Sequence, residues 1–183
     1  MIEGILVDHA AAKAMLECTR QHRPLEAGGL VLGLRKGPYL HVTEVTRPLA
    51  WDRQSSARFQ RSPLGHRFAA LRRWRKSGGK VDWIGEWHSH PGFSLSPSSI
   101  DTRNWHRIVR QRKTDMIFPI CDGRETAFYL QWWGDRVRVR LRQFEKDELG
   151  TLYLTPAAIE HRLRTTGEHT TAPTFASKAA AIG

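Results

Sequence analysis

The sequence predicts one α/β (α+β) domain in which a mixed β-sheet lies between helices. Two observations lead to this prediction. Segments rich in β-forming residues alternate with amphipathic segments of helical period as far as about residue 112, and three more β-rich segments then follow with short turns between them. Alternation of this kind is typical of a sheet covered by helices, and successive short strands indicate a meander. The 183 residues allow one sizeable core.

The first elements are strands around one helix. Gly4–Val7 is expected to be a short strand, and Asp8 can cap a helix that ends before Pro24. Ala27–Leu34 is a continuous apolar run bounded by glycines, which favours a buried strand. Tyr39–Thr46 alternates and is expected to pair with that run as a hairpin.

The middle of the chain begins with an irregular segment. Trp51–Arg61 is polar and lacks a clear period, so it is expected to be a loop. Ser62 and Pro63 are typical of a helix start, and the helix is expected to run to Lys76. Val81–Trp87 is the next expected strand.

The remaining elements are one long helix, a meander and a short helix. Ser98–Arg112 carries an apolar stripe of helical period. Met116–Cys121, Glu125–Trp133 and Arg136–Gln143 are expected to be three strands joined by turns. A short helix is expected to begin at Thr155.

These elements suggest a division of the chain into three parts. Residues 1–145 are expected to form the domain and 146–164 a C-terminal helical extension. Residues 165–183 are rich in Thr, Ala and Ser, so we expect a disordered tail.

Composition narrows the class of protein. The net charge of +11 is concentrated between Arg53 and Val81, a stretch with nine basic and no acidic residues. Such a surface favours an acidic partner, either a protein or a nucleic acid. No apolar run is long enough for a membrane span, and the N-terminus does not resemble a secretory signal, so the expected location is the cytoplasm. Cys18 and Cys121 are expected to be buried thiols.

The most informative motif is H-x-H-x7-S-x2-D, formed by His88, His90, Ser98 and Asp101. Two imidazoles and a carboxylate are a three-ligand set that leaves one position of a tetrahedral Zn²⁺ open for water, which is typical of catalytic sites. Ser98-x-x-Asp101 also has the form of a helix capping box. The two interpretations are compatible, because the cap uses the serine oxygen locally.

The motif resembles that of the JAMM metalloproteases, the JAB/MPN+ family, and most closely their prokaryotic branch. The resemblance spans about residues 3–143 and includes a second block, Pro24–Gly33. It implies a curved mixed sheet flanked by helices, related to the cytidine deaminase architecture, and it assigns the catalytic glutamate to Glu26. The zinc ligands would be His88, His90 and Asp101.

The expected chemistry is hydrolysis by a zinc-activated water molecule. Glu26 would accept the proton of that water, and Ser98 would donate to the developing oxyanion. Glu86 remains an alternative base or a residue that orients a histidine. Phe93 and Leu95, between the ligands, are candidates for the substrate groove.

Strand parity adds an expectation for two neighbouring tryptophans. It places Trp83 and Trp87 on the face opposite Glu86 and His88.

The resemblance implies a peptidase or isopeptidase that cuts after the C-terminal tail of a ubiquitin-like protein. Bacterial relatives of this kind accompany ubiquitin-like conjugation and antiphage systems. The alternative is a nucleic-acid-binding protein similar to the RadC branch of the same superfamily. The high positive charge favours that alternative, whereas the sequence after the second histidine departs from the RadC pattern.

Overall fold

The structure is a computed structural model that describes residues 1–92 and 94–166. The expected disordered tail lies outside the described residues, except that residues 165 and 166 end the last helix. In chain order the elements are β1 (Gly4–Asp8), α1 (His9–His22), β2 (Gly28–Lys36), β3 (Tyr39–Val45), β4 (Arg53–Ser55), β5 (Arg58–Gln60), α2 (Pro63–Lys76), β6 (Asp82–Ser89), α3 (Ser99–Arg112), β7 (Met116–Cys121), β8 (Thr126–Gln131), β9 (Arg138–Arg140), β10 (Arg142–Lys146), β11 (Gly150–Leu154) and α4 (Pro156–Thr166).

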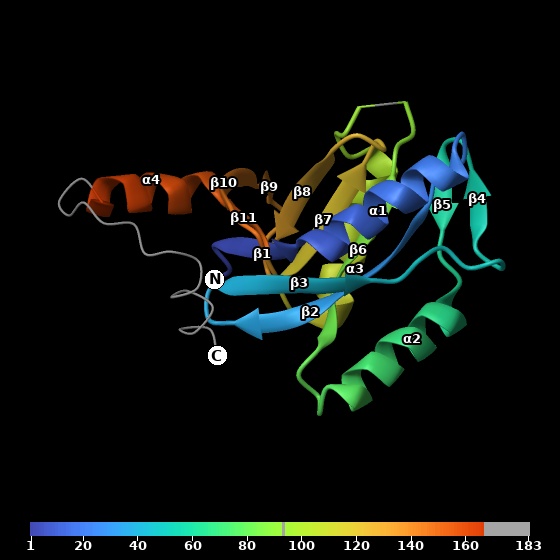
Figure 1. Ribbon diagram of the computed structural model, residues 1–183, viewed down its shortest axis with the longest axis horizontal. Helices are drawn as coiled ribbons and strands as arrows, with labels where there is room; N and C mark the ends of the chain where they lie inside the picture. Colours follow the sequence, from blue (N-terminus) through green and yellow to red (C-terminus); the bar gives the residue numbers. More distant parts are fainter. Residues whose placement is uncertain (93, 167–183) are drawn as a thin grey trace.

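Nine of these strands form one mixed sheet, in the order β10-β11-β1-β3-β2-β6-β7-β8-β9 (Figure 1). The pairs β1–β3 and β6–β7 are parallel, and the others are antiparallel. The two end strands, β9 and β10, are separated in the chain only by Leu141. The sheet is therefore so strongly curved that a single residue connects its two end strands. The expected mixed, curved sheet flanked by helices is confirmed.

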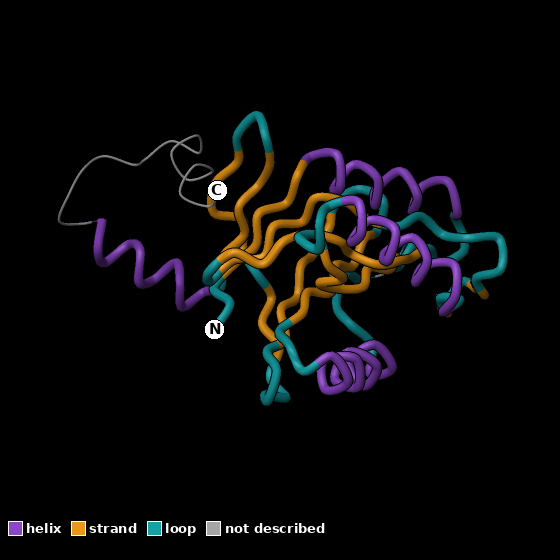
Figure 2. The backbone as a smooth tube through the Cα atoms, turned by 90° about the horizontal axis from the view of Figure 1, so that it is seen from below, coloured by secondary structure: helices purple, strands orange, loops and turns teal. Residues whose placement is uncertain are grey.

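The helices cover both faces of this sheet (Figure 2). Helix α1 packs its buried residues, among them Met15, against Ile117 and other side chains of the enclosed core. Helix α3 packs Trp105 against Phe118, which points to the opposite face of the same strand, β7. The functional site described below lies on the α3 side.

Three expectations for the elements are corrected. The expected loop at Trp51–Arg61 contains the hairpin β4–β5, which pairs Gln54 with Phe59. The expected strand Arg136–Gln143 is divided between β9 and β10 because the chain passes there from one end of the sheet to the other. The segment 146–164 is not purely helical, since β11 enters the main sheet between β1 and β10.

Other expectations are confirmed or extended. Cys18 and Cys121 are buried free thiols, and burial raises the pKa of Cys121 to about 12. Asp8 occupies the N-cap position of α1, but its carboxylate accepts a hydrogen bond from His41 Nε2 at 2.7 Å instead of capping the helix. No helix among residues 1–92 and 94–166 is both long and apolar enough to span a membrane.

Candidate active site

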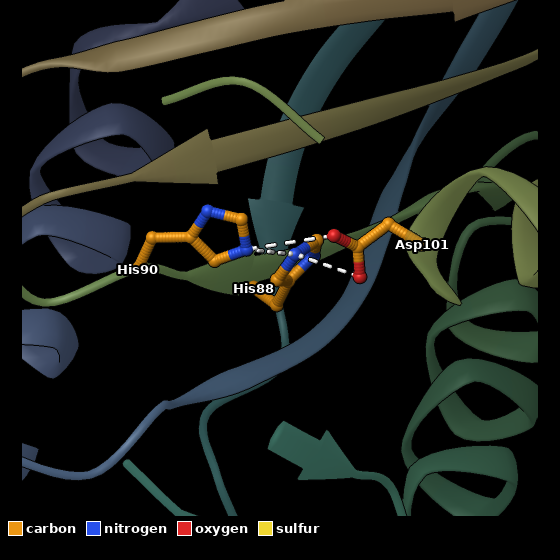
Figure 3. Close-up of side chains that lie close together, drawn as sticks. All are labelled: His88, His90 and Asp101. Atoms are coloured by element: carbon orange, nitrogen blue, oxygen red, sulfur yellow. Dashed lines mark hydrogen bonds and ion pairs between the residues drawn. The ribbon is translucent and has the colours of Figure 1, made fainter. Parts of the chain in front are cut away.

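The two histidines of the motif lie where β6 ends. His88 is the second-last residue of β6, and His90 follows the strand, held by a hydrogen bond from its backbone N–H to the carbonyl of Cys121 on β7. Their Nε2 atoms are 3.1 Å apart and lie 3.3 Å (His88) and 3.5 Å (His90) from the Asp101 carboxylate oxygens. Figure 3 shows both imidazoles turned toward this carboxylate. The structure thus brings together the three residues that the motif predicts.

Asp101 reaches this position because of how α3 begins. Ser98 Oγ accepts a hydrogen bond from the Asp101 backbone N–H at 3.2 Å, and the Asp101 carboxylate accepts one from the Ser98 N–H at 2.7 Å. The predicted capping box is therefore confirmed, with aspartate in the place of the usual glutamate. The same carboxylate faces both histidines, so the two interpretations of the motif coexist.

The geometry of this cluster fits a zinc ion. Two ligand atoms on one tetrahedral zinc at roughly 2.1 Å lie roughly 3.4 Å apart. The separations among the two Nε2 atoms and the Asp101 oxygens, 3.1 to 3.5 Å, agree with that value. The Nδ1 atom of His90 lies 2.9 Å from the carbonyl oxygen of Ser94. This contact orients the ring so that the Nε2 atom of His90 faces the cluster. Two imidazoles and one carboxylate are therefore a donor set that fits zinc.

The electrostatics of the cluster couple its members. Burial opposes the charge of Asp101, but hydrogen bonds from His88 and His90 outweigh it and lower the pKa of Asp101 well below its ordinary value. Burial likewise opposes the charged form of His90, yet hydrogen bonds to Asp101 and to the Ser94 carbonyl raise its pKa. The site therefore keeps the Asp101 carboxylate negatively charged and favours a positive charge next to it. A bound cation would supply that positive charge.

Glu26 lies beside the cluster, although it comes from a different part of the chain. Gly28 of β2 pairs with His88 of β6, and Glu26 directly precedes that paired region. It is 7% exposed, and burial raises its pKa even though His88 and His90 nearby act in the opposite direction. A buried carboxylate with a raised pKa, next to a cluster of residues that could hold a metal ion, is a candidate general base.

Glu86, the alternative base, is engaged elsewhere. Its carboxylate accepts a hydrogen bond from Arg61 Nη2 at 2.6 Å, and both side chains are about one-fifth exposed. The Arg61 guanidinium also lies over the Trp83 ring, 5.5 Å from its centre.

The contact with Trp83 corrects the parity argument. Trp83 lies on the same face as Glu86, because a β-bulge in the β2–β6 pairing passes over Ile84 and shifts the alternation by one residue. Trp87 does lie on the opposite face, in the enclosed core with Ile84.

A cleft of about 430 Å³ opens over these groups. One wall is the start of α3, with Ser98 and Asp101, and the other is the β4–β5 hairpin. Leu95 is 9% exposed and packs in the core with Trp105, so it is not among the described residues that line the cleft. Phe93 lies outside the described residues. The lining residues are Glu26, Gly29, Ser56, Ala57, Arg58, Phe59, Arg61, Glu86, Trp87, His88, His90, Ser94, Ser96, Ser98, Ile100, Asp101, Asn104 and Trp105.

Sequence reasoning missed the hairpin wall and its contacts with Glu26. The backbone N–H of Glu26 donates to the carbonyl of Ser55 at 2.8 Å, and the backbone N–H of Phe59 donates to the Glu26 carboxylate. The only indication in the sequence is the short alternation Arg58-Phe59-Gln60 within a polar segment, which is too brief to predict a strand.

Together, the curved sheet and the His-His-Asp cluster at the end of β6 and the start of α3, which could hold a metal ion, are features of a JAB-type domain. The chain belongs to the family described as prokaryotic homologs of the JAB domain, whose sequence model matches residues 8–147. The recognition of this family from the motif is confirmed.

Two curated relatives and one solved structure illustrate the similarity. A CD-NTase/cGAS isopeptidase from Pseudomonas aeruginosa is 39% identical over 107 residues, which cover 56% of this chain and 68% of that protein. A probable metalloprotease, y4qB, from Sinorhizobium fredii is 29% identical over 158 residues, 79% of this chain and 91% of that protein. The solution structure of protein DSY2949 from Desulfitobacterium hafniense aligns with a TM-score of 0.61 at 27% identity, covering 79% of this chain and 94% of that one.

Proposed function

We propose that this protein is a zinc-dependent isopeptidase that releases a protein attached through its C-terminal tail. The single observation that supports this proposal most is the convergence of His88, His90 and Asp101 beside the buried carboxylate of Glu26. The family agrees with it, and so do the isopeptidase and metalloprotease names of the relatives.

The proposed roles of the residues follow from their positions. His88, His90 and Asp101 would hold the zinc ion. When bound, zinc supplies Lewis acidity, which makes a water molecule more acidic and polarises the scissile carbonyl. Glu26 accepts the proton of the attacking water and returns it to the leaving amine. Its raised pKa suits both steps, because a base that must later act as an acid works best with a pKa nearer to neutrality.

Ser98 is proposed to stabilise the oxyanion that forms when the carbonyl is attacked. In the capping box its Oγ acts as an acceptor, from the Asp101 N–H, so the hydroxyl proton remains available for donation. Ser98 lines the cleft next to the ligand that it positions. A donor fixed in this way can lower the activation barrier by several kcal/mol. In enzymes where one such donor was removed, the barrier rose by roughly 3–4 kcal/mol.

Glu86 is proposed to support the site and not to act as the base. Its carboxylate is neutralised by Arg61, and this pair ties the end of the β4–β5 hairpin to β6. The pair therefore connects one wall of the cleft to the strand that carries His88.

The proposed substrate is a ubiquitin-like protein, or a CD-NTase as the name of the Pseudomonas relative suggests, whose extended tail enters the cleft. The folded body of the substrate would rest on α2, which begins two residues after the cleft residue Arg61. Leu64 and Phe68 on α2 are 67% and 70% exposed, and the basic residues around them favour an acidic protein.

The experiment uses the full chain with one bound zinc and two probes, a ubiquitin-like protein and a CD-NTase, each joined through its C-terminal tail to a reporter protein. We expect the wild type to cleave at least one probe. Glu26→Gln should lose at least about a thousandfold in kcat with its zinc retained, because the base contributes only to the chemical step. Phe68→Asp should raise KM for the folded probes but not for a short tail peptide.

The matched control is Glu86→Gln, which removes the other carboxylate of the cleft. It should lose less than about tenfold in kcat, since Glu86 only supports the hairpin. Retained cleavage by Glu26→Gln together with loss in Glu86→Gln would transfer the role of base to Glu86. Salt-sensitive binding of DNA without cleavage of either probe would favour the nucleic-acid alternative.

A further inference from the structure

A buried polar network lies behind the hairpin wall, outside the catalytic cleft. Its centre is His66 of α2, which is fully buried. His66 Nδ1 lies 2.6 Å from Thr46 Oγ1, and His66 Nε2 lies 3.0 Å from the Asp52 carboxylate, whose side chain is also fully buried. An acid, an imidazole and a hydroxyl are thus joined in a row.

This row is not arranged to attack a substrate. Thr46 Oγ1 already accepts a hydrogen bond from the Leu30 N–H at 2.7 Å, and the Thr46 carbonyl accepts one from Trp87 Nε1 at 3.0 Å. Thr46 is 8% exposed and lies outside the cleft lining. These bonds connect the network to β2 and β6, the two strands beneath the active site.

Asp52 joins the two ends of the segment that contains the hairpin. Its Oδ2 accepts from the Leu49 N–H and its Oδ1 from the Ser62 N–H, both at 2.7 Å. The Asp52 carboxylate therefore accepts three hydrogen bonds, if that from His66 is included. One donor, Leu49, precedes the hairpin in the chain, and the other two, Ser62 and His66, follow it. An asparagine of the same shape could not replace it, because its NH2 group would meet one of these N–H donors.

The far end of the same hairpin holds Glu26. Ser55 of β4 accepts from the Glu26 backbone N–H at 2.8 Å, and the Phe59 N–H of β5 donates to the Glu26 carboxylate. The Phe59 ring packs on Gly28, where a Cβ atom would come within 2.5 Å of the ring. The hairpin thus contacts the backbone and the side chain of Glu26 and the strand that follows it.

We propose that Asp52 and His66 are positioning residues that fix the β4–β5 hairpin on β2 and β6, so that the hairpin holds the Glu26 carboxylate at the cleft. The effect on the reaction rests on the proposed function, in which Glu26 is the base. The effect on the hairpin does not, because it follows from the hydrogen bonds alone.

The first measurement is hydrogen exchange in the zinc-loaded full chain. Asp52→Asn and His66→Phe should each speed exchange of the Glu26 amide, which is bonded to Ser55, and of the Phe59 amide by at least tenfold. Amides of the β6–β7 pairing should be unchanged. The control is Asp147→Asn, which removes a carboxylate that also accepts from two backbone N–H groups, those of Leu149 and Gly150, but between β10 and β11. Unchanged exchange at Glu26 and Phe59 in both hairpin variants would overturn the proposal.

The second measurement is a double-mutant cycle on kcat/KM with the reporter probe that the wild type cleaves. Asp52→Asn should cost at least tenfold in the wild type and less than twofold in a Glu26→Gln background, because the network acts through Glu26. Equal losses in both backgrounds would overturn the positioning role. If Asp52→Asn does not fold, His66→Phe provides the same comparison. Full activity of Glu26→Gln would instead refute the proposed base, while the exchange measurement would still test the hairpin.

Discussion

The two walls of the cleft are stabilised in different ways. The α3 wall is held by a capping box between Ser98 and Asp101, three residues apart in the chain. The hairpin wall is held by Asp52, by the Arg61–Glu86 ion pair and by contacts with Glu26, all between residues distant in sequence or in different elements. The position of Asp101 therefore depends on local structure, whereas the position of the proposed base depends on the tertiary fold. A substitution that disturbs the α3 wall should therefore reduce zinc binding, whereas one that disturbs the hairpin wall should reduce turnover and leave zinc binding intact.

The largest effect is expected at the α3 wall. Asp101→Ala removes one proposed zinc ligand and also half of the capping box. We expect loss of stoichiometric zinc and at least about a thousandfold loss of probe cleavage, because the remaining imidazoles form an incomplete ligand set. Zinc content by mass spectrometry and cleavage rates are the measurements. A variant that keeps one zinc per chain and full activity would contradict the assignment of Asp101.

A smaller effect should separate the two roles of Ser98. Ser98→Ala should lower kcat by about 10²–10³, as expected for loss of an oxyanion donor, and lower stability by about 1 kcal/mol through the lost cap. Ser98→Asp restores a capping side chain but has no hydroxyl proton to donate. Its Tm should return toward that of the wild type while kcat remains low. Recovery of kcat in Ser98→Asp would mean that the serine acts only as a cap.

The smallest effect concerns Glu26, which the hairpin wall contacts, and it is an effect on stability. Burial raises the pKa of Glu26, so the folded, metal-free protein binds this proton more tightly than the unfolded chain does. The stability contributed by the protonated form is complete below the unfolded pKa and is lost as the pH rises through the raised pKa. Glu26→Gln should therefore raise the Tm slightly at neutral pH and have almost no effect at acidic pH. Thermal unfolding in a chelator, beside Glu86→Gln, tests this; a lower Tm at neutral pH would contradict it.

The sequence was sufficient for features that depend on local pattern. The apolar strand at Ala27–Leu34, the helix from Pro63 to Lys76 and the capping box at Ser98 were predicted from local pattern and start residues, and all three are present. The cluster of His88, His90 and Asp101 was predicted because its ligands come from one fourteen-residue motif.

The features that the sequence did not reveal depend on long-range pairing. The hairpin at 53–60 has too few residues per strand to show a period, and β11 is stabilised by β1, which is far away in the chain. The bulge at Ile84, which moved Trp83 to the site face, leaves no mark in the residue pattern. The Arg61–Glu86 pair could not be foreseen for the same reason.

The position of β11 has a consequence for how the chain folds during synthesis. β1 emerges first, yet it lies between β3 and β11, and its antiparallel partner is among the last residues of the sheet to be made. Until then one edge of β1 is unpaired and can template association with another chain. Contacts this far apart in sequence also slow folding. The last strand therefore completes the sheet only after the proposed metal ligands and the proposed base have all been synthesised.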